Sequence, residues 1–179
     1  MQYTRDGTPR DRAVRFRVEL HVDPLTLGGP VSAARSTKDR ALVQMQSGAV
    51  PPGLSRRARE LARELDDAAP QHAVVQHIAD ALRRDHVYLP PGAEGAATSL
   101  EAFVVDRSGG HCELFATSAA LMLRSLRIPC RLVTGYLGEE WDESGQVLTI
   151  RRRHAHAWVE VLDPEGGWYT VDATPAAGS

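Results

Sequence analysis

The hydrophobic period of the chain changes at Pro129, and this change limits the folds that the chain can adopt. Between residues 51 and 129, apolar residues recur every three or four positions, as in amphipathic helices, whereas after Pro129 they alternate with polar residues, as in half-buried strands. Helices therefore come first and strands follow one another, without the alternating strand–helix units that build a parallel sheet. This order predicts an α+β fold in which helices pack on an antiparallel sheet.

Three main helices are predicted ahead of the strands. Ser55 is the predicted N-cap of the first helix, Pro70 opens the second, and the third begins at Cys112. The third helix must end before Pro129, because proline lacks a backbone N–H and clashes with the preceding turn. The apolar stripes of the three helices are, in order, Ala58, Leu61, Ala62 and Leu65; Val74, Ile78, Ala81 and Leu82; and Phe115, Ala119, Met122 and Leu126.

The predicted strands fall into two groups. One strand, at residues 13–23, stands near the N-terminus, where apolar and polar residues alternate without a break. The other four follow Pro129 and comprise residues 130–137, 147–152, 154–162 and 168–172. We therefore expect a β-containing N-terminal extension at residues 1–50 and a core domain at residues 51–179.

Composition and charge argue against several classes of function. The 179 residues carry 21 lysines and arginines against 23 aspartates and glutamates, a net charge of −2, so no nucleic-acid partner is expected. No apolar run approaches the ~18 residues of a membrane span, and the chain itself is not expected to contact a membrane. The two cysteines, Cys112 and Cys130, do not make a disulfide scaffold.

Cys112 has the sequence context of a reactive thiol. It comes shortly after Gly109 and Gly110 and starts an amphipathic helix, where free N–H groups and the helix dipole stabilise a thiolate. The glycines would let the backbone approach a substrate closely, and the N–H groups would hold an oxyanion during acyl transfer. The alternative is that Cys112 is a small buried hydrophobic residue, as many free cysteines are.

A general base is predicted on the strand at residues 154–162. Its alternation puts His154, His156 and Trp158 on one face, while alanines and valines form the packed face. A single histidine on a strand is more often structural. Two histidines beside a tryptophan on one accessible face are typical of a ligand-facing surface.

Asp172 lies on the next strand, and the register of this hairpin decides whether it reaches His156. With a three-residue turn between Leu162 and Gly166, His156 faces Asp172 directly, with Cβ atoms roughly 4.5–5.5 Å apart. A four-residue turn would put the two residues on opposite faces of the sheet. In the first register, the carboxylate would fix the imidazole tautomer and stabilise the imidazolium, completing a Cys–His–Asp arrangement for acyl transfer.

Four motifs in the second half of the chain come in a fixed order. They are Gly110-His111-Cys112-Glu113-Leu114-Phe115-Ala116, Ile128-Pro129-Cys130-Arg131, His156-Ala157-Trp158-Val159-Glu160-Val161, and Gly167-Trp168-Tyr169-Thr170-Val171-Asp172-Ala173-Thr174-Pro175. In order and spacing they resemble the motifs of the transglutaminase-like superfamily, and a weaker likeness covers residues 51–89. The resemblance implies a papain-like fold with a triad of Cys112 as nucleophile, His156 as base and Asp172 as the residue that orients the base.

The resemblance also implies a reaction. Cys112 would attack an amide carbonyl of a peptide or protein substrate, and the resulting thioester would pass to water or to an amine, without a cofactor. For bacterial relatives we favour hydrolysis of a peptide or amide over transamidation. Tyr88 is a candidate for a hydroxyl at the oxyanion, since an aromatic or amide group ahead of the cysteine has this role in related enzymes.

Two alternatives remain open. A zinc site would use Cys112, His154, His156 and Asp172, all of which can bind zinc, although the paired short spacings of structural zinc sites are missing. A non-catalytic binding domain would keep the fold without the chemistry. A catalytic site predicts one fast-reacting thiol, whereas a zinc site predicts stoichiometric metal and a binding domain predicts neither.

The chain departs from the family at three positions. Arg127 stands where glycine is usual, and a left-handed arginine costs about 1 kcal/mol. Cys130 replaces a small residue, and His154 replaces a common acidic one.

The N-terminal part also resembles the segment ahead of this core in bacterial membrane-anchored members. We therefore expect a cytoplasmic location if the chain is complete, and the extracytoplasmic face if it is a fragment of a membrane-anchored protein.

Overall fold

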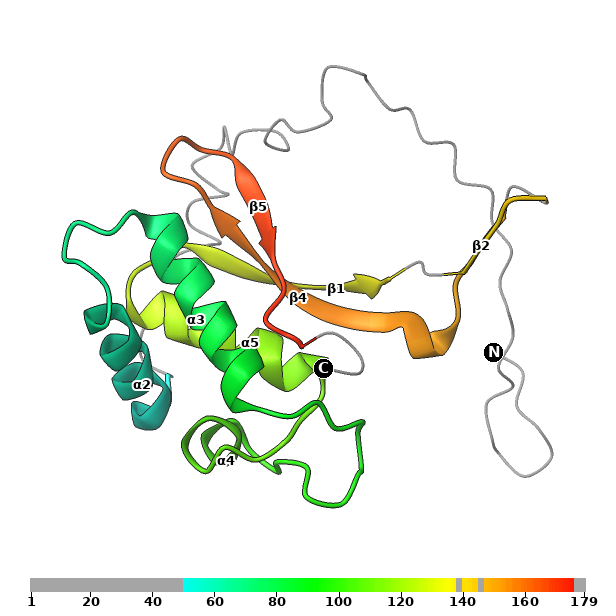
Figure 1. Ribbon diagram of the computed structural model, residues 1–179, viewed down its shortest axis with the longest axis horizontal. Coiled ribbons are helices and arrows are strands. Elements are labelled where there is room, and N and C mark those ends of the chain that lie inside the picture. The colour runs from blue at the N-terminus through cyan, green and yellow to red at the C-terminus, as the bar shows by residue number, and fades with distance from the viewer. Residues whose placement is uncertain (1–49, 138–139, 145–146, 176–179) are drawn as a thin grey trace.

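The computed structural model describes residues 50–137, 140–144 and 147–175 (Figure 1). The strand predicted at residues 13–23 lies outside the described residues, and the division into an extension and a core stays a prediction. In the described part, helices come first and strands follow, which confirms the predicted α+β order. The helices are α2 (Pro52–Arg63), α3 (Gln71–Asp85), α4 (Leu100–Val105) and α5 (Cys112–Ser125).

Proline, and not Ser55, starts the first helix. α2 begins at Pro52 with Pro51 as its N-cap, and proline suits the first turn because its missing N–H would have no intrahelical partner there. Ser55 lies one turn inside α2, so its prediction as the N-cap is wrong. The second helix does follow Pro70, which is the N-cap of α3.

The main sheet has three antiparallel strands in the order β1-β4-β5. They are β1 (Cys130–Tyr136), β4 (Ala155–Leu162) and β5 (Trp168–Val171). The strand predicted at residues 147–152 is shorter, because β3 (Val147–Thr149) pairs with β2 (Glu140–Asp142) in a separate two-stranded ribbon.

His154 precedes β4, and its prediction as a strand residue is wrong. Arg152–His154 form a 3-10 turn, η2, which is closed by hydrogen bonds to Arg151 and Arg152. The His154 N–H donates to the Arg151 carbonyl at 2.9 Å, and the Arg151 N–H donates to His154 Nδ1 at 3.1 Å. The side chain of His154 is consequently buried beside the turn and does not continue the exposed face of β4.

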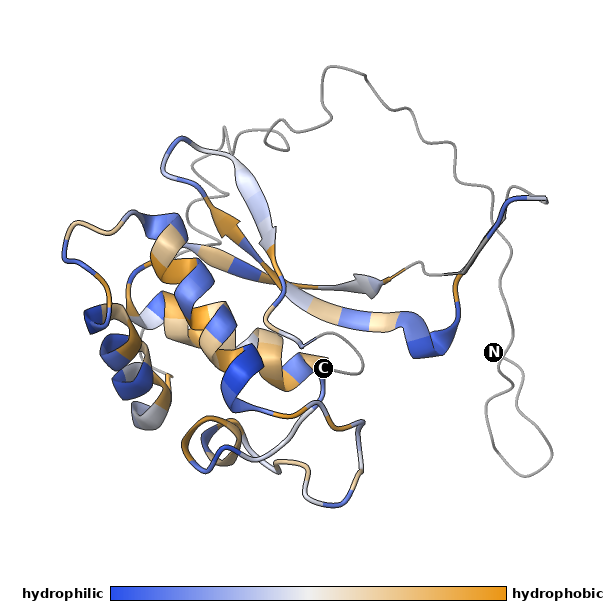
Figure 2. Ribbon diagram, viewed as in Figure 1, coloured by the Kyte–Doolittle hydropathy of each residue, from blue (hydrophilic) through white to orange (hydrophobic). Residues whose placement is uncertain are grey.

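Helix α5 forms the centre of the core. It packs against β4 and β1 of the sheet and also against α2, α3 and α4 (Figure 1). Its predicted apolar stripe is confirmed, since Phe115, Ala119 and Met122 are buried and Leu126 packs against the core. Burying a side chain of the size of Phe115 stabilises the fold by about 1.5–3 kcal/mol. Figure 2 shows hydrophobic residues along α3 and α5, whereas the outer turns of α2 are hydrophilic.

Helix α5 is followed by Arg127, the arginine that stands where the family usually has glycine. Arg127 has a φ of 61°, in the left-handed region that glycine adopts most readily. This conformation lets the Ile128 N–H donate to the Leu123 carbonyl at 3.0 Å, which closes the helix before Pro129. The predicted left-handed arginine is thus confirmed.

Candidate active site

Cys112 is the first residue of α5, as predicted. Its side chain is half-buried, and the N–H groups of Cys112 and Glu113 lie at the helix end where backbone donors lack intrahelical partners. The thiol is therefore placed among free donors and partial positive charge, which stabilise a thiolate or a nearby oxyanion.

Gly109 and Gly110 have a packing role that differs from the predicted one. A Cβ on Gly109 would lie 2.5 Å from Leu89 Cδ1 and 3.1 Å from the Val87 carbonyl oxygen. Gly110 pairs with the same segment, because the Leu89 N–H donates to the Gly110 carbonyl at 2.8 Å. The glycines thus admit the protein's own backbone to the loop ahead of α5. Close approach of a substrate at this point stays a prediction.

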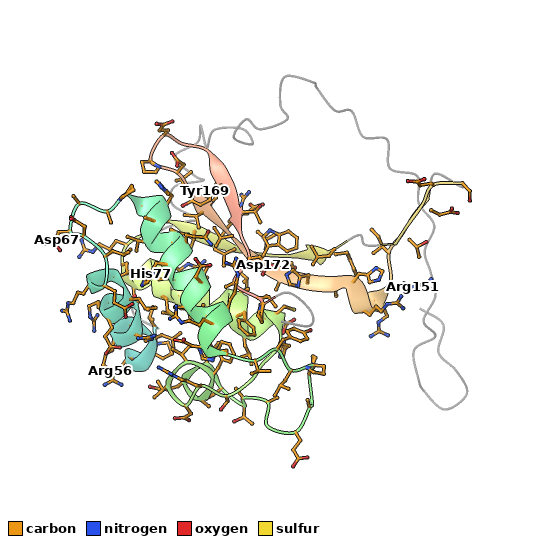
Figure 3. All side chains as sticks on the ribbon, viewed as in Figure 1. Arg56, Asp67, His77, Arg151, Tyr169 and Asp172 are labelled. Carbon is orange, nitrogen blue, oxygen red and sulfur yellow. The ribbon has the colours of Figure 1, made fainter. Side chains whose placement is uncertain are left out.

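His156 and Asp172 form a hydrogen-bonded pair. His156 Nε2 donates to Asp172 Oδ2 at 2.7 Å. The other carboxylate oxygen accepts from the Thr174 N–H at 2.9 Å, and Arg83 of α3 donates to the main-chain carbonyl of Asp172. Figure 3 shows Asp172 where the sheet meets the helices. Because the carboxylate is held on both oxygens, it fixes the imidazole ring and leaves the ring's Nδ1 for another partner.

The register that brings this pair together differs from the predicted one. Leu162 pairs with Trp168, so β5 is displaced by two residues from the predicted pairing, because the turn takes residues 163–167. A displacement of two residues keeps each side chain on its predicted face. Asp172 therefore lies just beyond the end of β5, diagonal to His156 instead of opposite it, and still reaches the ring.

Cys112 and His156 line one cavity, which has a volume of about 590 Å³. This volume lies within the usual range of ligand pockets. The start of α5 contributes one part of the wall, and the end of β1 with the start of β4 contributes another. The lining residues are Tyr88, Pro91, His111, Cys112, Glu113, Thr134, Gly135, Tyr136, Arg152, Arg153, Ala155 and His156.

Gly135 shapes the wall on the histidine side. It pairs with His156 across β1 and β4, and a Cβ on Gly135 would lie 2.7 Å from Trp158 Cη2. The missing side chain leaves room for the indole, which lies nearly parallel to the His156 ring, with 19° between the planes and 6.2 Å between the centroids. Trp158 thus lies beside the histidine, in the space that Gly135 leaves open.

Tyr88 also lines the cavity. Its position is fixed by a β-bridge to Gly110, ahead of Cys112. Burial raises the pKa of the Tyr88 hydroxyl, and negative charge on Cys112 raises this pKa further. The hydroxyl therefore stays protonated and remains a hydrogen-bond donor beside the thiol.

Two other candidate residues are absent from the lining of this cavity. His154 is buried in η2, and Cys130 is buried in the core with its Sγ 3.4 Å from the Ala120 carbonyl oxygen. Burial raises the pKa of Cys130 to about 11. Within residues 50–137, 140–144 and 147–175, no three His, Cys, Asp or Glu side chains gather closely enough to hold a metal ion. The geometry therefore gives the zinc alternative no support.

The sequence did not reveal the roles of Arg83 and Gly135. A glycine inside a strand often marks close approach of another group, so Gly135 carried a usable signal. Arg83 is outside the predicted apolar stripe of its helix, and it lies 89 residues from Asp172 along the chain. No local pattern could connect residues so far apart.

Comparison with known proteins agrees with the predicted resemblance. The sequence profile of the transglutaminase-like superfamily matches residues 58–173. A protein-glutamine gamma-glutamyltransferase of Pseudomonas aeruginosa is 41% identical over 124 residues, which are 66% of this chain and 18% of that protein. The uncharacterized protein YebA of Bacillus subtilis is 35% identical over 79 residues, which are 42% of this chain and 11% of that protein. The chain thus spans less than a fifth of the length of either relative.

The fold is similar to that of a periplasmic domain. The crystal structure of the periplasmic domain of TgpA from Pseudomonas aeruginosa, bound to ethylmercury, matches with a TM-score of 0.63 and 32% identity. The match covers 77% of this chain and 49% of that one. Every helix of this chain that the structure describes is too short or too polar to cross a membrane. With its family profile, its fold and its sequence relatives in agreement, the chain belongs to the transglutaminase-like superfamily.

Proposed function

We propose that this domain is a thiol-dependent acyl-transfer enzyme that acts on amide groups of peptides or proteins. One observation carries this proposal: Cys112, at the start of α5, lines the same cavity as His156. The Nε2 of His156 is in turn hydrogen-bonded to the carboxylate of Asp172. A thiol at a helix N-terminus, near an imidazole that a carboxylate orients by a hydrogen bond, is the arrangement that activates a cysteine nucleophile.

The first half of the reaction forms a thioester. The Cys112 thiolate attacks the amide carbonyl carbon, and a carbon–sulfur bond forms while the carbonyl oxygen takes negative charge. His156, protonated by the thiol, returns this proton to the amide nitrogen as the carbon–nitrogen bond breaks. Asp172 stabilises the imidazolium in between through its 2.7 Å hydrogen bond. The leaving group departs as ammonia or an amine, and the acyl group stays on sulfur.

The developing oxyanion has donors of two kinds within the cavity. The N–H groups at the start of α5 are fixed donors, and the protonated hydroxyl of Tyr88 is a further one. Removing one donor of this kind from an oxyanion site lowers the rate by about 10²–10³-fold in enzymes where this has been measured. Tyr88, which the resemblance makes a candidate for this role, is therefore our proposed side-chain donor to the oxyanion.

The second half transfers the acyl group to water or to a primary amine. The name of the relative from Pseudomonas aeruginosa, protein-glutamine gamma-glutamyltransferase, favours the side-chain amide of glutamine as donor and an amine as acceptor. Hydrolysis, which we favour from the sequence for bacterial relatives, uses the same thioester with water as acceptor. The two outcomes differ in the second step, and one assay separates them.

The test uses a blocked peptide with a central glutamine and a fluorescent primary amine, followed by mass spectrometry. Transamidation gives a peptide–amine adduct, and hydrolysis gives the glutamate peptide or a cleaved backbone. Cys112→Ala, which keeps the fold, should give none of these products. If the wild-type protein also gives no product and no acyl-enzyme with any donor peptide, the non-catalytic alternative is correct.

A further inference from the structure

We infer that the cavity selects an acyl donor that carries a carboxylate close to the reacting amide, bound by Arg152 and Arg153. The inference rests on the proposed function and names its class of substrate. Both arginines line the same cavity as Cys112 and His156. Arg151, Arg152 and Arg153 follow one another in the sequence, and two of these three arginines are therefore part of the wall of the site.

The arginines are held at a short distance from the histidine. They belong to η2, which leads directly into β4, and His156 is the second residue of that strand. From the rise per residue of a 3-10 turn and a strand, the backbones of Arg153 and His156 are roughly 9 Å apart. An extended peptide advances about 3.3–3.6 Å per residue, so a carboxylate within about three residues of the amide can reach the arginines.

The chemistry of this wall favours a carboxylate. A guanidinium keeps its charge at every physiological pH and offers a planar set of donors that matches the two oxygens of a carboxylate. Arg152 and Arg153 are both exposed; in the described part of the chain no ion pair joins Arg152 to another residue, whereas Arg153 already interacts with another group of the protein. The α5 part of the wall carries Glu113 instead, so positive charge is concentrated on the η2 side of the cavity. A carboxylate of the donor would therefore bind on that side.

The experiment compares two alkylating reagents of similar shape but different charge, anionic iodoacetate and neutral iodoacetamide. The measured quantity is the rate of Cys112 alkylation by iodoacetate divided by its rate with iodoacetamide. Both rates are read by peptide mass mapping at pH 7, and 2-mercaptoethanol is the reference thiol. A basic wall should raise this ratio above that of the reference. Arg152→Gln/Arg153→Gln should lower the ratio about fivefold, while the iodoacetamide rate is retained and reports an intact site.

The matched control removes the same two charges from helix α2. Arg56→Gln/Arg59→Gln changes exposed residues outside the cavity and should leave the ratio unchanged. Added salt should reduce the ratio of the wild-type protein, because charge attraction in an open cavity is screened. A ratio that is unaffected by the cavity substitutions, or equally affected by the control pair, overturns the inference. A Cys112 that resists iodoacetamide as well would instead overturn the proposed function.

A peptide arm identifies the source of the carboxylate and uses only the wild-type protein. Three blocked glutamine peptides protect Cys112 from iodoacetamide: one with a neighbouring glutamate, one neutral, and one neutral but with a free C-terminal carboxylate. Stronger protection by the glutamate peptide than by the neutral one indicates an acidic side chain, and stronger protection by the free acid indicates a chain terminus. Equal protection by all three peptides contradicts the inference.

Discussion

At the scale of single residues, the two cysteines have opposite environments. Cys130 is fully buried, and burial raises its pKa to about 11, so that only about a thousandth of it is thiolate at pH 8. Cys112 lies at a helix N-terminus and lines an open cavity with His156. The same functional group is therefore shielded in the core at one position and open to a cavity beside a histidine at the other.

The carboxylate of Asp172 orients His156, and Asp172→Asn tests this role. The variant should keep the fold, because the side chain is nearly isosteric and can still accept from the Thr174 N–H. Its rate should fall about 10- to 1000-fold, since an amide can favour the wrong tautomer of the imidazole and stabilises the imidazolium less. The measurement is the transamidation or hydrolysis rate together with the melting temperature. Full activity, or a lower melting temperature alone, would make Asp172 a structural residue.

The two neighbouring histidines should respond differently to truncation. His156→Ala should abolish turnover with little change in melting temperature, because the side chain borders the cavity and is the base in the proposed mechanism. His154→Ala should lower the melting temperature and leave most of the activity, because His154 is buried and accepts the Arg151 N–H in η2. Activity assays and thermal unfolding of both variants check this. The reverse result would mean that His154 is the base.

At the scale of elements, the start of α5 depends on the segment that packs against its leading loop. Gly109→Ala would place a Cβ 3.1 Å from the Val87 carbonyl oxygen, so the backbone of residues 87–89 must move. Because Tyr88 lies in this segment and lines the cavity, the rate should fall about tenfold or more. The measurement is the transamidation or hydrolysis rate, divided by the concentration of folded protein.

A glycine far from the cavity is the control for this prediction. Gly166, in the turn between β4 and β5, has a φ of 100°, and an added Cβ would meet nothing within 4 Å. Gly166→Ala should therefore cost about 1 kcal/mol of stability through backbone strain and leave the rate unchanged. Equal activity of the Gly109→Ala and Gly166→Ala variants would contradict a positioning role for the segment at residues 87–89.

The elements also show what the sequence can and cannot predict. The stripe of α5 and the packed face of β4 follow from periodicity, because each depends on neighbours a few positions away. The displaced register of β5 could not be predicted, since it depends on the length of a turn whose residues permit several lengths. Asp172 nevertheless lies on the predicted face of the sheet, because a displacement of two residues keeps each side chain on the same face.

At the scale of the whole molecule, the loop ahead of Cys112 is tied to the helical core through His86. The ring of His86 stacks on Phe103, with 4.3 Å between the centroids, and its Nδ1 lies 3.5 Å from the Ser108 carbonyl oxygen. Burial lowers the pKa of His86, while the hydrogen bond to Ser108 and the charge of Asp85 oppose this effect. Arg107 and Arg57 add to the lowering.

This lowered pKa predicts how stability depends on pH. Below the ordinary histidine pKa of 6.5, the unfolded chain binds a proton at this position that the folded protein does not bind. Stability should therefore fall as the pH decreases from 7.5 to 5.5. The melting temperature of the wild-type protein should drop more over this range than that of His86→Phe, which keeps the ring stacking but cannot titrate. Parallel curves for the two proteins would exclude His86 as the cause.

The packing of distant segments also explains why the candidate site residues could be named from the sequence while Arg83 could not. Cys112, His156 and Asp172 each lie in a local motif, whereas Arg83 becomes relevant only when α3 packs beside the sheet and reaches the main chain of Asp172. Contacts between distant segments leave no periodic trace in the sequence. They appear only once the fold is known.

The central claim is that Cys112 is an activated nucleophile, and its alkylation rate tests this claim most directly. Iodoacetamide at about pH 6.5, read by peptide mass mapping, should label Cys112 at least about 100-fold faster than Cys130. His156→Ala should slow the labelling of Cys112 to that of an ordinary exposed thiol. Equal labelling of the two cysteines, or a Cys112 rate that is unchanged in His156→Ala, would contradict the claim.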